Sequence, residues 1–169
     1  MKKYELTNEA INFKNKKLFR IRALKDFGYV KAGDLGGYVE NENNLAQENN
    51  CWIYHNAKVY DDAKVFDNGW VFENAEIYGN AWVFRDGWVF DNAKIYENAW
   101  IFANANIFGN VRVSGNAKVS GEARVYDDVE IYENAWVFGD AEISGNLQIF
   151  GDARIRGNGK RIKGEENND

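Results

Sequence analysis

The hydrophobic and polar positions of the chain follow a repeat of six residues. From Asn44, position one of every hexad is Asn, Asp or Glu, position two is usually Ala or Gly, and position four is Val or Ile from Ile53 to Ile155. Side chains alternate across a strand, so positions two and four share one side and positions three and five the other. The repeat therefore predicts short strands whose Ala, Val and Ile side chains point inward.

Tight turns are predicted between consecutive strands. Position six and the following position one form pairs such as Gly-Asn, Asp-Asn, Glu-Asn and Gly-Asp. These residue types tolerate positive φ best, which a sharp corner requires. A short strand and a corner every six residues give a coil that closes after three sides. The twenty hexads of residues 44–163 then make between six and seven coils.

The hexads resemble those of the hexapeptide-repeat family, whose fold is a left-handed parallel β-helix. The resemblance implies an all-β triangular prism with three hexads per turn over residues 44–163. Residues 1–43 do not follow the six-residue repeat and are predicted to form an N-terminal cap over the apolar end of the prism. Within the cap, "ELTNEAINF" predicts a short helical turn and "KKLFRIRALK" predicts a strand. Residues 164–169 are predicted to be disordered.

The head segment adds a second resemblance. The stretch "KYELT", together with "LFRIRALKDFGYVKAGDLGGYVENENNLAQENNCWIYHNAKVY", is similar to the YdcK-like group of bacterial and bacteriophage hexapeptide-repeat proteins. Members of that group are often labelled as transferases. With the repeat, the resemblance covers nearly the whole chain, and it implies the fold and a phage or prophage setting more than it implies an activity.

Composition and charge narrow the classes of function. A formal net charge of -5 argues against a general nucleic-acid footprint. The single cysteine excludes an intramolecular disulfide and suits a reducing compartment. No apolar run has the length of a signal peptide core or a membrane span. We therefore expect a cytoplasmic protein with no membrane partner.

Aromatic residues occupy the outward positions. All six Trp stand at position three, and most residues at position five are Phe or Tyr. Sorting by eighteen residues places the Trp on two of the three faces, and large exposed aromatic patches indicate an interface. The predicted interface residues are Trp52, Trp70, Phe72, Trp88 and Phe90 on the first face, and Trp82, Phe84, Trp100, Phe102, Trp136 and Phe138 on the second. The third face has no Trp and is predicted to be solvated.

Two other interpretations of the aromatic positions stay open. Like rings about 4.8 Å apart on neighbouring strands could stack on one another and only stiffen the sheets. The rings could instead stack on sugars or bases, although rings that already stack on their neighbours offer edges rather than free faces.

One coil interrupts the aromatic pattern with small and basic residues. The stretch "NVRVSGNAKVSGEARV" is a candidate polar notch for a ligand or a partner side chain, and the alternative is ordinary solvated surface. The residues of this candidate notch are Arg112, Ser114, Lys118, Ser120 and Arg124.

Candidate catalytic residues are few. Hexapeptide-repeat acyltransferases generally use a histidine as general base, and the only histidine here is His55, at a corner. One histidine cannot supply the three ligands of a zinc site of the carbonic anhydrase type. Cys51 stands at an inward position, where a thiol packs as a small apolar group. No phosphate-binding glycine loop occurs, so we expect no metal and no cofactor.

The sequence favours a non-enzymatic binding or scaffold protein. Its aromatic faces are expected to mediate homo-oligomerisation, as a dimer or trimer, or the capture of a protein partner, which in a phage setting could be a host factor. An acyltransferase-like enzyme is the first alternative, and a glycan or nucleotide binder is the second.

Overall fold

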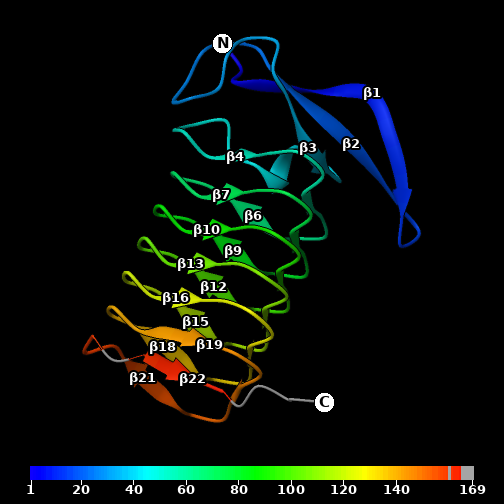
Figure 1. Cartoon of the computed structure of the whole chain (residues 1–169). Coiled ribbons are helices and arrows are strands. Elements are labelled where there is room, and N and C mark those ends of the chain that lie inside the picture. Colours follow the sequence, from blue (N-terminus) through cyan, green and yellow to red (C-terminus); the bar gives the residue numbers. More distant parts are fainter. Residues whose placement is uncertain (160, 165–169) are drawn as a thin grey trace.

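The computed structural model describes residues 1–159 and 161–164, and it consists almost entirely of strands and turns. Short strands stack into three sheets, and each coil contributes one strand to each sheet (Figure 1). The predicted all-β prism, with three sides and between six and seven coils, is confirmed. Within the described residues, no helix is long and apolar enough to cross a membrane.

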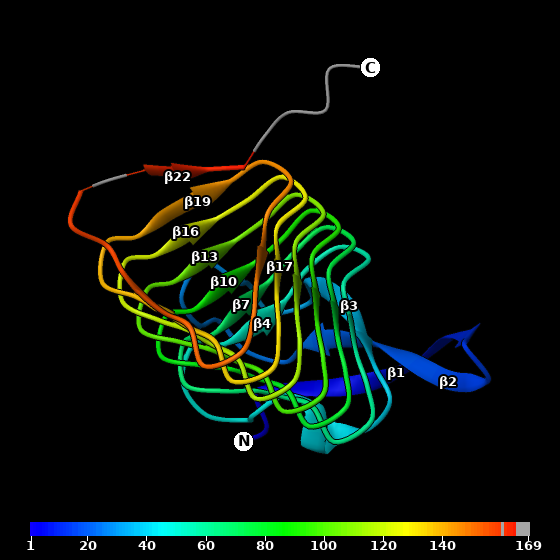
Figure 2. The same ribbon diagram turned by 90° about the horizontal axis from the view of Figure 1, so that it is seen from below.

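The first predicted face is a seven-stranded parallel sheet, which runs along one side of the prism in Figure 2. Its strands are β4 (Trp52–Ile53), β7 (Trp70–Val71), β10 (Trp88–Val89), β13 (Asn106–Ile107), β16 (Arg124–Val125), β19 (Glu142–Ser144) and β22 (Arg161–Lys163). The second predicted face is a six-stranded parallel sheet. Its strands are β6 (Lys64–Val65), β9 (Trp82–Val83), β12 (Trp100–Ile101), β15 (Lys118–Val119), β18 (Trp136–Phe138) and β21 (Arg154–Arg156).

The third predicted face belongs to a nine-stranded sheet that also includes the head segment. Its strands are β1 (Tyr4–Phe13), β2 (Lys16–Ala23), β3 (Leu35–Val39), β5 (Lys58–Val59), β8 (Glu76–Ile77), β11 (Lys94–Ile95), β14 (Arg112–Val113), β17 (Glu130–Ile131) and β20 (Gln148–Ile149). The strands β1, β2 and β3 pair in antiparallel fashion, and β3 then pairs in parallel with β5.

The register of the coils follows the hexads, with a difference at each end. Between β4 and β21 each strand pairs with the strand eighteen residues further on, as Trp70 pairs with Trp88. In the first coil Val39 pairs with Val59 and Leu45 bridges Val65, both twenty residues apart, so two additional residues lie between Leu45 and Trp52, after the 3₁₀ helix η1 (Glu42–Asn44). In the last coil Ile143 pairs with Ile162, so this coil is one residue longer. The regular eighteen-residue register thus begins at Trp52, whereas the sequence pattern predicted it from Asn44.

The interior of the prism is built from positions two and four. Ala residues at position two and Val or Ile at position four are fully buried from Ala57 to Val137. Position six has positive φ in every hexad from Asn49 to Gly151. Corners are therefore left-handed turns, which is why Gly, Asp, Asn and Glu occupy them.

The head segment differs from the prediction in its first element. The stretch predicted as a short helical turn forms β1, which pairs with β2 along a hairpin beside the N-terminal end of the prism (Figure 1). Pairing with a strand further along the chain satisfies the backbone of β1, and a local pattern cannot reveal such a partner. The hairpin buries Leu18 and Ile21, and the segment closes the first coil. The predicted disordered tail, 164–169, lies outside the described residues except for Gly164.

Candidate functional site

Aromatic side chains at position five stack along the prism. The longest regular stacks are Tyr60, Tyr78 and Tyr96 on the nine-stranded sheet, Phe66, Phe84 and Phe102 on the six-stranded sheet, and Phe90, Phe108 and Tyr126 on the seven-stranded sheet. Neighbouring rings in these stacks are nearly parallel, with centroids 4.8 to 5.1 Å apart. The interstrand spacing of a sheet imposes this distance.

Tryptophans at position three add a second layer of ring contacts. Trp82 and Trp100 stack at 5.1 Å, and Trp70 and Trp88 stack at 5.4 Å. Rings at position five also lean on the tryptophan of the next coil, as Phe84 leans on Trp100 at 6.1 Å. Stacking of this kind buries part of every ring, so the ladders stabilise the prism whatever else they bind.

The seven-stranded sheet exposes its tryptophans unequally. Trp52 is only 1% exposed, because Tyr4 and Phe27 of the head segment pack against its ring in edge-to-face contacts. Trp52 is therefore a core residue, and its assignment to an exposed interface is corrected. Trp88, by contrast, is 41% exposed.

The ring stack of the seven-stranded sheet is broken between Phe72 and Phe90. These rings lie 6.4 Å apart at 90°, whereas Phe72 stacks on Tyr54 and Phe90 stacks on Phe108. Phe72 leans on Trp88 of the next coil, but the corresponding neighbour of Phe90 is Asn106, which has no ring to lean on. A cavity of about 250 Å³ opens at the break, lined by Phe72, Glu73, Trp88, Phe90 and Asp91.

The aromatic residues of the six-stranded sheet are more completely covered. Phe84 is buried, and Trp82, Trp100, Phe102, Trp136 and Phe138 are half-buried. Cations lie over the exposed rings: Lys118 Nζ is 4.7 Å from the centroid of Trp100, and the Arg154 guanidinium is 5.8 Å from that of Trp136. These contacts already satisfy the ring faces that a partner could use.

The residues of the candidate polar notch do not meet in one place. Arg112 and Ser114 lie on the nine-stranded sheet, Lys118 and Ser120 on the six-stranded sheet, and Arg124 on the seven-stranded sheet. Because the three faces point in different directions, the structure divides the single predicted notch into separate environments. Ser120 is buried, and its hydroxyl accepts a 3.0 Å hydrogen bond from Trp136 Nε1.

Ser114 leaves a gap in the ring stack of the nine-stranded sheet. Tyr96 precedes it by one coil and Tyr132 follows it by one coil, and no ring lies between them at position five. Tyr96 stacks on Tyr78 of the preceding coil, and Tyr132 stacks on Phe150 of the following coil. Each of the two rings therefore has its other face toward the gap. A cavity of about 390 Å³ occupies the gap, and its lining also includes Arg112, Glu97, Glu130 and Glu133.

The nine-stranded face is not uniformly solvated, which differs from the prediction. Near the head segment Tyr60 is only 3% exposed, because Phe13 of the β1–β2 hairpin packs edge-to-face against it. Lys14 of the same hairpin forms an ion pair with Glu76. Opposite charges do alternate further along this face, where Lys94 pairs with Glu76 and Arg112 with Glu130.

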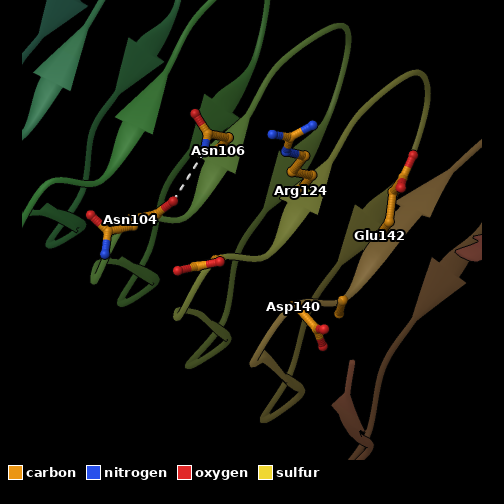
Figure 3. A pocket seen from close by; sticks show the side chains of 7 residues that line it. Asn104, Asn106, Arg124, Asp140 and Glu142 are labelled. Atoms are coloured by element: carbon orange, nitrogen blue, oxygen red, sulfur yellow. Dashed lines mark hydrogen bonds between the residues drawn. The ribbon is translucent and has the colours of Figure 1, made fainter. Parts of the chain in front are cut away.

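Arg124 lines a third, polar hollow at the corner between the six-stranded and seven-stranded sheets. Asn104, Asn106, Glu122, Asp140 and Glu142 surround a volume of about 430 Å³, and Arg124 lies between Asn106 and Glu142 on successive coils (Figure 3). Among the described residues, no group of three or more His, Cys, Asp or Glu is arranged to hold a metal ion. The hollow offers charges but no aromatic wall, and Ala141 is the one apolar residue of its lining.

His55 and Cys51 occupy different environments. His55 is exposed at a corner, where its Nδ1 lies 3.3 Å from Glu73 Oε1. Cys51 is buried beneath Lys3, whose Nζ donates hydrogen bonds to Cys51 O and Cys51 Sγ. Burial raises the pKa of the Cys51 thiol and lowers the pKa of the Lys3 ammonium. A thiol that is kept protonated and buried is a poor nucleophile.

The sequence pattern did not predict several residues of these surfaces. For the gap between Tyr96 and Tyr132, however, the pattern did contain a signal. Tyr29 of the head segment packs edge-to-face on Trp70 and is 84% exposed, which no repeat could indicate. Tyr96 and Tyr132 were assigned to a solvated face. Sorting position five by eighteen residues does reveal the Ser between two Tyr, but the sequence alone does not say whether a neighbour fills that gap.

Comparisons with known proteins give no assignment. No protein-family model matches the chain, and a search of curated proteins finds no match.

Proposed function

We propose that the chain is a non-enzymatic binding or scaffold protein, whose aromatic seven-stranded face associates with a second copy of the chain or with a partner protein. The observation that carries this proposal is the break at Phe72 and Phe90, beside the 41% exposed Trp88. Exposed tryptophan beside an apolar cavity is typical of the central residues of protein interfaces.

The rigidity of the prism supports the same interpretation. Parallel strands and ring stacks hold Trp88 and Phe90 in place before any partner arrives. A preorganised surface loses little conformational entropy on binding, so more of the contact energy contributes to affinity. The surface proposed here comprises Tyr29, Trp70, Phe72, Trp88 and Phe90 and is called the Trp88 surface below.

The proposal also includes a family relationship and a biological setting. The head segment and the hexads support a place in the YdcK-like group of hexapeptide-repeat proteins, with a phage or prophage setting and a host protein as partner. A cytoplasmic location accords with the buried Cys51 thiol, because reducing compartments keep free cysteines. These statements rest on resemblance and composition.

The alternative function, that of an acyltransferase, depends on a single pair of residues, His55 and Glu73. His55 Nδ1 lies 3.3 Å from Glu73 Oε1, and a carboxylate can orient a histidine base. The cavities at Phe90, Ser114 and Arg124 are not lined by His55. If acetyl-CoA-dependent activity is found, unchanged activity in His55→Ala would remove this candidate base.

The molar mass in solution tests the proposal. We expect light scattering to give two or three times 19.4 kDa for the wild-type chain, and a lower mass for Trp88→Ser. Phe150→Ser is the matched control, because Phe150 is 54% exposed but lies on the nine-stranded sheet. A wild-type monomer excludes homo-oligomerisation and leaves only partner capture. An oligomer that both variants retain would place the contact elsewhere and contradict the proposed surface.

A further inference from the structure

The gap at Ser114 is the one interruption of a ring stack that no neighbouring ring fills within the described coils of the nine-stranded sheet. The stack runs Tyr60, Tyr78, Tyr96, then Ser114, then Tyr132 and Phe150. The equivalent gap on the six-stranded sheet, at Ser120, is closed by Trp136 of the next coil, whose Nε1 reaches the Ser120 hydroxyl. The residue that corresponds to Trp136 on the nine-stranded sheet is Glu130, which has no ring.

The height of the gap suits one planar group. Tyr96 and Tyr132 are two coils apart, so their rings are separated by about 9.6 Å, twice the usual interstrand spacing. A flat group midway between them would lie about 5 Å from each ring. That distance matches the 5.0 Å between the stacked rings of Tyr78 and Tyr96. We call the space between Tyr96 and Tyr132 the Ser114 slot.

The corner next to the slot leaves it open and acidic. Gly115 contributes no side chain there, while Glu97 stands one coil before it and Glu133 one coil after it. Each carboxylate is fixed through one oxygen: Glu97 Oε2 accepts a 2.6 Å hydrogen bond from Gly115 N, and Glu133 Oε2 accepts a 2.7 Å bond from Gly151 N. The Glu97 carboxylate is thus held at the level of the slot, and its Oε1 forms no hydrogen bond with the described residues and is available to a donor, whereas the Glu133 carboxylate is turned to the coil beyond Tyr132.

The charge of the lining selects a cation. The lining holds three glutamates, Glu97, Glu130 and Glu133, against one basic residue, Arg112, and the Glu97 carboxylate is held at the level of the slot. The Arg112 guanidinium lies beside Glu130, with 3.7 Å between Nη1 and Oε1, and it makes no ring contact with Tyr96 or Tyr132. The excess of negative charge disfavours a phosphate-bearing ligand and favours a planar cation.

We propose that the Ser114 slot binds the guanidinium group of an arginine side chain from a partner protein. The guanidinium is flat, stacks on aromatic faces and donates hydrogen bonds in a fork that matches carboxylates. Tyr96 and Tyr132 sandwich it, and Glu97 accepts its hydrogen bonds at the open corner. This inference rests on the proposed function as a protein binder and names the partner chemistry of a second surface, separate from the Trp88 surface.

A peptide titration of the full chain tests the proposal. The probe is Gly-Arg-Gly with an acetylated N-terminus and an amidated C-terminus, compared with the same peptides carrying Lys or Phe. We expect the arginine peptide to shift the ring-proton NMR signals of Tyr96 and Tyr132 and to bind at least about tenfold more tightly than the lysine peptide, because an ammonium group cannot stack as a plane.

Two variants of Ser114 separate binding from folding. Ser114→Tyr places a ring in the slot from within, so it should abolish binding while the thermal unfolding midpoint stays unchanged or rises. Ser114→Ala leaves the slot open and should keep binding within about twofold of the wild type. Glu97→Gln should weaken binding several-fold, since it removes the charge but keeps the shape, and Glu133→Gln should weaken it less, because the Glu133 carboxylate is held one coil beyond Tyr132.

Several outcomes would overturn the inference. Equal or tighter binding of the phenylalanine peptide would mean that the slot takes neutral rings, and binding that survives Ser114→Tyr would place the peptide elsewhere. Absence of any shift with the arginine peptide at 10 mM, a concentration set well above a weak millimolar affinity, would exclude the site. If the slot fails while Trp88-dependent self-association persists, only this inference is lost and the proposed function stands.

Discussion

Trp136 and Ser120 together close a gap in the ring stack of the six-stranded sheet. The indole Nε1 of Trp136 donates a 3.0 Å hydrogen bond to Ser120 Oγ, and the ring packs beside Phe138 with centroids 4.8 Å apart. The two residues are sixteen positions apart, which places the indole one coil after the serine. The same geometric relationship joins Ser114 to Glu130, where the gap stays open. A single residue in the next coil thus decides whether a serine makes a cavity.

Trp136→Ala should therefore destabilise the prism more than loss of a more exposed tryptophan. The variant removes a half-buried ring and leaves the buried Ser120 hydroxyl without its donor, and we expect a cost of about 2 to 3 kcal/mol. Urea unfolding followed by circular dichroism measures this difference. Trp88→Ala is the control, with an expected cost of about 1 kcal/mol because Trp88 is more exposed and makes no side-chain hydrogen bond with the described residues. Equal costs would contradict the role given to the Trp136–Ser120 pair.

The hexads carried enough information to predict the prism, because the same inward pattern recurs in every coil. Positions two and four, such as Ala99 and Ile101, are buried as the alternation requires. The structure of the head segment was harder to predict from the sequence, because β1 depends on pairing with β2. The burial of Trp52 likewise depends on how Tyr4 and Phe27 fold over it. Contacts of that kind join segments with no shared repeat.

The candidate sites, too, were only partly predictable from the repeat. Sorting by eighteen residues placed the aromatic residues on the correct faces, but it gave no ring orientations, and the break between Phe72 and Phe90 is a matter of orientation. The polar coil was interpreted as one notch because its residues are adjacent in sequence. A corner every six residues separates them, so Ser114 and Ser120 lie on different sheets.

Asparagine side chains form a ladder along one corner, and its interruption should have a measurable cost. Each amide nitrogen donates to the next residue eighteen positions on, from Asn80 through Asn98, Asn116 and Asn134 to Asp152. Asn116→Ala removes two of these exposed hydrogen bonds, and we expect about 1 kcal/mol less stability in chemical unfolding.

Asn74→Ala is the matched control for the asparagine ladder. Asn74 occupies the same position of its hexad, but its side chain makes no hydrogen bond with the described residues, so a change within ~0.5 kcal/mol is expected. A cost for Asn74→Ala as large as that for Asn116→Ala would show that position one matters through backbone conformation and not through the ladder.

Gly109 is required at its corner by two independent features. Its φ is +73°, and an added Cβ would lie 2.8 Å from Asp127 N of the next coil. We expect Gly109→Ala to lower stability by about 2 to 3 kcal/mol, through left-handed strain and the close backbone contact. The reverse change at another corner, Ala103→Gly, relieves a positive φ of 54° and should be neutral or stabilising by up to about 1 kcal/mol. Thermal unfolding of both variants measures this, and a stable Gly109→Ala would refute the steric argument.

Tyr78 should make the prism sensitive to alkaline pH. Burial raises the pKa of its hydroxyl to about 12, with a further contribution from the neighbouring Tyr96, against a reference value of 10.0. Between these two values the unfolded chain releases the proton and the folded chain keeps it, so the contribution of Tyr78 is present below pH 10 and is lost as pH rises toward 12. The ring is partly exposed, so solvent screening limits the loss to about 1 kcal/mol.

Tyr78→Phe tests this pH dependence without disturbing the ring stack. The thermal midpoint of the variant should fall less steeply than that of the wild type between pH 10 and pH 12, and the two should agree closely at pH 8. Some slope will remain, because burial also raises the pKa of Tyr4 and Tyr60. Tyr29→Phe, at an 84% exposed ring, should reproduce the wild-type profile. If Tyr78→Phe reproduced it as well, burial of the Tyr78 hydroxyl would have no part in the alkaline loss of stability.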